Sequence, residues 1–214
     1  LSLLGMMRFC GLGWPAPRLK TAAAAYACAA ACFLLALLSK TVTATLPAVM
    51  VVLLWWKRGR VTWREGLALA PFFALGAVAG LMTAGLEKLR VGAIGPDWDF
   101  TPAERVLIAG RALWFYAGKL AWPHPLAFIY PRWNLNPAAA QQWIFPAAAL
   151  ATVALLWWFR RRLGRGPLAA VLIFGGTLFP ALGFFNVYPM RYSFVADHFQ
   201  YLAGAALLAG FAAI

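Results

Sequence analysis

A small number of ionisable side chains stand between long apolar runs, and these are the residues that could carry chemistry. Lys40, Arg132 and Arg191 are cations, while Asp197 and His198 are neighbours in the chain. Cations at the edge of a membrane suit a phosphate head group, because charge-assisted hydrogen bonds to phosphate are strong where water is scarce. A carboxylate beside them could take a proton from an acceptor hydroxyl. We therefore predict Lys40, Arg132 and Arg191 as substrate-binding cations, with Asp197 and His198 as the catalytic candidates.

Arg191 is the strongest single candidate among the cations. Its planar guanidinium matches the geometry of a phosphate, and the preceding Tyr188-Pro189-Met190 places it just outside an apolar run. Tyr130 and Tyr192 are further hydroxyl-bearing neighbours, and we predict Tyr201 as an additional substrate-binding residue.

Each of these residues also has a purely structural interpretation. Lys40 lies at a hairpin turn and could extend its amine to the membrane interface. Asp197 and His198 precede an apolar run and could be solvated residues that cap a helix. Arg132 could simply pair with the acidic residues of its own loop. The sequence leaves these alternatives open.

No resident cofactor is predicted from the sequence. His124 and His198 lie far apart and lack a carboxylate cluster, so they give no metal site of recognisable spacing. Phosphate-binding, dinucleotide-binding and G-x-S-x-G motifs are absent. The segment Asp97-Trp98-Asp99 is a D-x-D pattern of the kind that holds a metal ion with a nucleotide sugar, so a divalent metal remains open. Cys28 and Cys32, four residues apart in an apolar run, indicate helix-face packing and not a redox pair.

The composition shows which elements must position these residues. Of the 214 residues, 64% are hydrophobic and 12% are charged. Soluble domains average about 45–50% apolar and about 25% charged residues, so an ordinary soluble enzyme is excluded. Three cysteines are too few for a disulfide scaffold. We therefore predict an all-α, polytopic membrane helical bundle in a single membrane domain.

The apolar runs divide into about six membrane spans. Residues 21–56 contain a single charged residue, Lys40. As one helix they would be roughly 54 Å long, whereas the bilayer core is about 30 Å thick. We therefore predict two spans in this stretch. The spans are predicted near residues 21–38, 41–56, 66–86, 143–159, 167–186 and 201–214.

The basic clusters predict the orientation of these spans. Two basic clusters follow apolar runs, Lys57 to Arg60 and Arg160 to Arg162, and basic residues that anchor a span on its cytoplasmic side are typical of such positions. The net charge of +13 is therefore attributed to membrane orientation and not to nucleic-acid binding. Both clusters face the cytoplasm only if residues 87–142 form one external segment. Within that segment, residues 105–122 are predicted to form a helix. Its charged residues, with Glu104 just before it, lie within an arc of about 120° around the helix axis: Glu104, Arg105, Arg111 and Lys119. This arrangement favours an interfacial helix. A spanning helix that faces a polar cavity is the alternative.

Several stretches resemble the membrane O-mannosyltransferases that carry C-terminal tetratricopeptide repeats, which belong to the GT-C glycosyltransferases. The similar segments are Leu37-Leu38-Ser39-Lys40-Thr41 with Leu46-Pro47, the section Arg105 to Pro123, and Tyr188 to Leu202, including Ala196-Asp197-His198-Phe199-Gln200-Tyr201-Leu202. Thr41 stands where that family often has Glu, and His198 where it often has Arg. The chain begins with Leu1 and ends in an apolar run at Ile214, so we expect a fragment.

The resemblance implies inverting sugar transfer from a polyprenyl-phosphate donor to a hydroxyl on the non-cytoplasmic face. It implies a protein or glycan acceptor, an acidic base in an external loop upstream of Leu1, and repeats beyond Ile214. We expect a multi-pass protein of a bacterial inner membrane, with no nucleic-acid partner. The alternatives are a non-catalytic membrane anchor for a repeat domain and a transporter of lipid-linked sugars.

Overall fold

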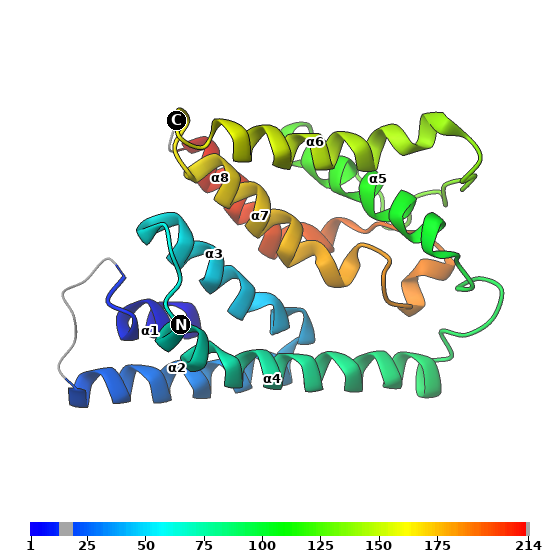
Figure 1. The fold of residues 1–214 in the computed structure, drawn as a ribbon. Coiled ribbons are helices and arrows are strands. Elements are labelled where there is room, and N and C mark those ends of the chain that lie inside the picture. The colour runs from blue at the N-terminus through cyan, green and yellow to red at the C-terminus, as the bar shows by residue number, and fades with distance from the viewer. Residues whose placement is uncertain (13–18, 213–214) are drawn as a thin grey trace. The chain divides into compact units, whose positions relative to one another are not determined.

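The computed structural model describes residues 1–12 and 19–212, and in this part of the chain all regular secondary structure is helical, with eight α-helices (Figure 1). The chain divides into two compact units, Leu1–Thr83 and Ala84–Ile214. The long helix α4, Trp63–Leu86, runs through the boundary between them.

The first unit contains α1 (Ser2–Phe9), α2 (Leu19–Ser39), the 3-10 turn Thr41–Thr45, α3 (Leu46–Arg58) and most of α4. Helix α1 lies beside α2, and the hydroxyl of Ser2 donates to the carbonyl of Ala29 at 2.8 Å. Apolar side chains from all four helices form one core, in which Met6, Phe33 and Phe72 are almost completely buried.

The turn between α3 and α4 has a local origin in the sequence. Gly59 adopts a positive φ of 76° and ends α3, a conformation that costs glycine little. Thr62 and Glu65 then form reciprocal hydrogen bonds at the start of α4. Arg58 pairs with Glu65, so the basic segment is tied to the beginning of the next helix.

The second unit contains α5 (Pro102–Ala121), α6 (Ile144–Phe159), α7 (Gly166–Leu178) and α8 (Tyr201–Ala212). The shorter turns in this unit are Glu87–Val91, Ala140–Trp143, Phe179–Ala181, Tyr188–Arg191 and Asp197–Gln200. Helix α5 packs against α6, and α7 packs along α8 (Figure 1).

Helix α5 is strongly specified by its own sequence. Thr101 and Glu104 form a complete capping box, and Pro102 occupies the first turn, where its missing N–H has no cost. Gly110 lies so close to α6 that a Cβ at this position would be 2.5 Å from the Pro146 nitrogen. A glycine is therefore needed where these two helices meet.

Three helices in the described part of the chain are long and apolar enough to cross a membrane: Lys20–Ser39, Trp63–Val91 and Ala140–Phe159. Many of their apolar side chains are exposed, with Leu35 at 67%, Leu81 at 71% and Leu150 at 72%. Exposed apolar surface of this extent is unfavourable in water and suits a bilayer. These helices support the predicted membrane association.

The three other predicted spans are shorter as helices. The segment predicted at 41–56 begins with a 3-10 turn before α3, which has 13 residues, and the segment at 167–186 is helical only to Leu178 before a short turn. Thirteen residues make a helix of about 20 Å, less than the bilayer core of about 30 Å. Helix α8 has 12 residues, and residues 213–214 lie outside the described part. The six-span arrangement therefore stays a prediction.

The predicted helix at 105–122 corresponds to α5, which begins three residues earlier. One face of α5 is buried in the second unit, including Ile108, Ala112 and Tyr116. Its position at the membrane interface stays a prediction.

Candidate functional site

Arg132 and Arg191 converge on one carboxylate, that of Asp97. The Nε of Arg191 lies 3.2 Å from one Asp97 oxygen, and a terminal nitrogen of Arg132 lies 3.5 Å from the other. Arg132 also donates to the backbone carbonyls of Asp97 at 3.1 Å and of Arg191 at 3.3 Å. Two predicted substrate-binding residues that are far apart in the chain are therefore neighbours in the structure.

Three irregular segments hold this group, which we call the arginine cluster: Asp97, Arg132 and Arg191. Next to Asp97, the indole of Trp98 is buried and donates to the carbonyl of Val187 at 3.0 Å. The backbone N–H of Tyr188 donates to the carboxylate of Glu87 at 2.9 Å. These contacts connect the loop before α5 with the turn that carries Arg191.

The arginine cluster carries a net charge of about +1 and remains accessible. The side chains of Arg132, Arg191 and Asp97 are 31%, 50% and 42% exposed, so an incoming anion could reach either guanidinium. Pairing at such exposure is weak, because solvent competes with it. The cluster therefore presents two partly exposed guanidinium groups beside one carboxylate.

Two tyrosine hydroxyls lie next to Arg191. The Tyr188 and Tyr192 hydroxyls are 3.5 Å apart, and the Arg191 guanidinium lies 6.0 Å from the Tyr192 ring centre. The hydrogen bond with Tyr192 lowers the pKa of Tyr188, and the charge of Arg191 acts in the same direction. The same hydrogen bond raises the pKa of Tyr192. The pair adds donors and acceptors to the rim of the cluster.

Asp197 is held by a tyrosine that comes from a different loop. The hydroxyl of Tyr130 donates to the two Asp197 carboxylate oxygens at 2.9 and 3.0 Å. The amine of Lys119 lies 5.2 Å from the Tyr130 ring centre. Burial raises the pKa of Tyr130, and its hydrogen bond to Asp197 acts in the same direction, so the phenol remains a donor at neutral pH. Asp197 is therefore a carboxylate in a defined position.

The other predicted site residues are exposed. His198 is exposed and packs against the Phe199 ring, with ring centres 4.4 Å apart. Tyr201 begins α8 and is 77% exposed. Lys40 is exposed and belongs to the first unit, so its predicted place beside Arg191 stays a prediction. Within the described residues, no group of three His, Cys, Asp or Glu side chains could share a metal ion.

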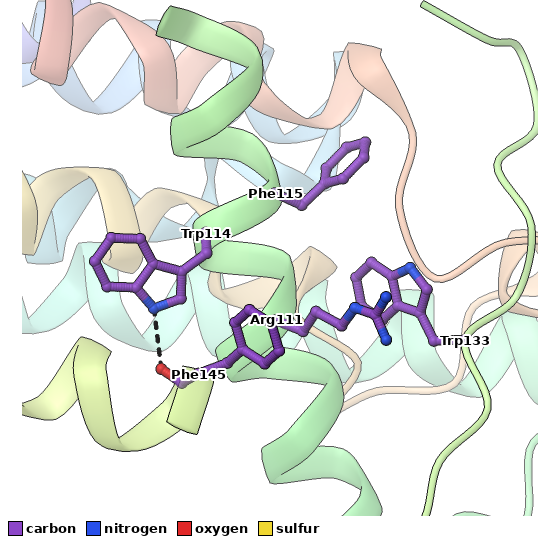
Figure 2. A pocket seen from close by; sticks show the side chains of 5 residues that line it. All are labelled: Arg111, Trp114, Phe115, Trp133 and Phe145. Atoms are coloured by element: carbon purple, nitrogen blue, oxygen red, sulfur yellow. Dashed lines mark hydrogen bonds between the residues drawn. The ribbon is translucent and has the colours of Figure 1, made fainter. Parts of the chain in front are cut away.

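A second feature was not predicted from the sequence: a cavity of about 270 Å³ beside α5 (Figure 2). It is lined by Arg111, Trp114, Phe115, Trp133 and Phe145. Three of these residues belong to α5, at spacings of three and four, which place side chains on one helix face. That spacing is a signal in the sequence, but it does not indicate that Trp133 and Phe145 complete the walls.

Comparison of the chain with family models, with curated proteins and with solved structures finds no match.

Proposed function

We propose that the chain is part of a GT-C type membrane glycosyltransferase, which moves a sugar from a polyprenyl phosphate to a hydroxyl acceptor on the non-cytoplasmic face. The membrane is a bacterial inner membrane, crossed by about six spans. The observation that carries the proposal is the convergence of Arg132 and Arg191 on Asp97. Both arginines come from loops that the charge distribution assigns to the non-cytoplasmic side.

In the proposed reaction, the acceptor oxygen forms a bond to the anomeric carbon while the bond from that carbon to the donor phosphate oxygen breaks. Negative charge grows on the departing phosphate, and nearby guanidinium groups stabilise it. Arg191 is the main candidate for this role, and Arg132 supports it by contacting both Arg191 and Asp97. Lys40, in the first unit, stays a predicted substrate-binding cation.

The acceptor proton needs a base, and Asp197 is the candidate within the chain. The single hydroxyl of Tyr130 is shared between the two oxygens of this carboxylate, which orients the group. His198, in the same turn, and Tyr201, at the start of α8, are proposed to contact the reacting groups. The resemblance implies a further acidic base upstream of Leu1, in which case Asp197 positions substrate and does not remove the proton.

The test is transfer of a radiolabelled sugar from a polyprenyl phosphate in vesicles that contain the protein. Arg191→Ala is expected to lower the turnover by about 10²–10³-fold, the range for loss of one donor that stabilises transition-state charge. Arg161→Ala is the matched control, because Arg161 is an exposed arginine of the basic segment after α6. Its turnover should equal that of the wild type.

The experiment also separates the alternatives. Normal turnover by Arg191→Ala would remove Arg191 from the mechanism. A wild-type protein that inserts but transfers no sugar would favour the non-catalytic anchor. Movement of the labelled donor to the opposite leaflet without transfer would favour the transporter.

A further inference from the structure

Arg111 holds a charge in an aromatic surrounding that lacks a matching anion. Its guanidinium lies 4.6 Å from the ring centre of Trp133 and 5.8 Å from that of Phe145. Within residues 1–12 and 19–212, it forms no hydrogen bond or ion pair with another side chain. Burial lowers the pKa of Arg111, which reflects partial removal of its charge from water. An external anion would compensate this charge.

The cavity beside Arg111 is separate from the arginine cluster. The Trp133 ring stacks on Arg111 and also packs against Phe194, with ring centres 5.8 Å apart. Arg132 lies against Phe194 at 5.0 Å, so the two aromatic rings stand between Arg111 and Arg132. Arg132 is already engaged by Asp97. The cavity and the arginine cluster therefore share no lining residue.

The position of the cavity relative to a membrane follows from α6. Phe145, one of its walls, lies in the first turn of α6, and the apolar segment Ala140–Phe159 is long enough to cross a bilayer. Ile144 is 63% exposed and Trp143 is 37% exposed at the same end. Tryptophans at the end of a span are typical of the interface, which is the depth of lipid phosphates.

The walls of the cavity are rigid and mostly apolar. The indole nitrogen of Trp114 donates to the carbonyl of Phe145 at 3.0 Å, which joins α5 to α6 and uses the only polar group of that side chain (Figure 2). Among the described residues that line the cavity, only Arg111 has a charged side chain. A volume of about 270 Å³ has room for a phosphate and the carbons next to it, given that a water takes about 30 Å³.

We propose that this cavity binds the phosphodiester of an anionic phospholipid, with Arg111 on the phosphate and the aromatic walls against the glycerol and the first acyl carbons. The single cation of the site matches the net charge of about −1 of an anionic phospholipid, whereas in a zwitterionic phospholipid the head group itself balances the phosphodiester. The aromatic walls favour an apolar body attached to it, which a free phosphate lacks. The bound lipid would connect α5, α6 and the loop that carries Trp133.

The experiment measures lipid adducts by native mass spectrometry of the purified protein in detergent. The probes are phosphatidylglycerol and phosphatidylcholine with identical acyl chains, added without any sugar donor. The wild type is expected to prefer phosphatidylglycerol. Arg111→Gln should weaken phosphatidylglycerol binding about tenfold, which corresponds to the loss of one charge-assisted hydrogen bond. It should weaken phosphatidylcholine binding less, because the choline cation already balances the charge of that phosphodiester.

Two further variants serve as controls for a folding defect and for a general effect of charge. Arg111→Lys keeps the charge but loses the planar stack on Trp133, so it should retain part of the preference. Arg161→Gln removes an exposed arginine elsewhere and should behave as the wild type. Retention of the full preference by Arg111→Gln, or an equal loss in Arg161→Gln, would overturn the site. Equal binding of both lipids by the wild type, or displacement of phosphatidylglycerol by inorganic phosphate, would also overturn it.

Discussion

The contact between α5 and α6 allows a sharp test, because two glycines of the same helix differ in what surrounds them. At Gly110, a Cβ would lie 2.5 Å from the nitrogen of Pro146 and 2.7 Å from its Cα. At Gly118, a Cβ would meet no atom within 4 Å. Replacement of each glycine by alanine therefore has the same intrinsic effect on α5, but only Gly110→Ala should disturb packing.

The expected magnitudes follow from these distances. Carbon atoms in contact lie about 3.5–4.0 Å apart, so Gly110→Ala requires a displacement of about 1 Å between two backbones. Overpacking of this kind costs about 1–3 kcal/mol, and the gain in helix propensity recovers up to about 1 kcal/mol. Since the obstacle is backbone, we expect a net loss of about 2 kcal/mol for Gly110→Ala. For Gly118→Ala we expect a gain of about 0.5–1 kcal/mol.

The assay is reversible unfolding in mixed micelles, in which a denaturing detergent is titrated and helix content is followed by circular dichroism. Phe145 immediately precedes Pro146 and lines the cavity beside Arg111, so Gly110→Ala should also weaken phosphatidylglycerol binding. A Gly110→Ala protein as stable as the wild type would refute the close approach of α5 and α6. A Gly118→Ala protein that loses as much stability would show that only helix flexibility matters.

Three other outcomes follow from the second unit and from the predicted orientation. Tyr130→Phe removes the hydroxyl that holds Asp197 and should lower the free energy of unfolding by about 1–2 kcal/mol, measured in the same titration. Because hydrogen bonding from Tyr192 lowers the pKa of Tyr188, Tyr192→Phe should move the ionisation of Tyr188 to higher pH in an ultraviolet difference titration; an unmoved ionisation would contradict the pairing. The predicted orientation can be tested in a chain whose three cysteines are replaced by serine. A cysteine introduced at position 134 should react with an impermeant reagent from the non-cytoplasmic side, and one introduced at position 162 should react from the cytoplasm. The reverse pattern would be incompatible with the predicted orientation.

Several helices were predicted well because their signals are local. The segment predicted at 66–86 is α4 from Trp63 to Leu86, the one at 143–159 is α6 from Ile144 to Phe159, and the one at 21–38 is α2 from Leu19 to Ser39. Hydropathy over about 20 residues depends on composition alone and needs no partner. The capping box at Thr101 and Glu104 equally lies within four residues.

Shorter helices were less well predicted, since an apolar run shows that a segment avoids water but not that it is helical throughout. Residues 41–45 form a 3-10 turn, and α7, which begins at Gly166, ends at Leu178, before Pro180. Proline limits the continuation of a helix, but the apolar residues on both sides of Pro180 favoured the prediction of one span over residues 167–186.

The helical character of the chain, its long apolar segments and its few ionisable side chains could all be recognised from the amino-acid sequence alone. Only the tertiary structure decided how those side chains combine: that Arg132 and Arg191 share Asp97, that Tyr130 holds Asp197, and that Arg111 lies among aromatic rings. The physical reason is that helix formation and transfer to an apolar medium depend on neighbours in the chain. Side-chain partners in irregular loops depend on paths that only packing against the rest of the fold defines.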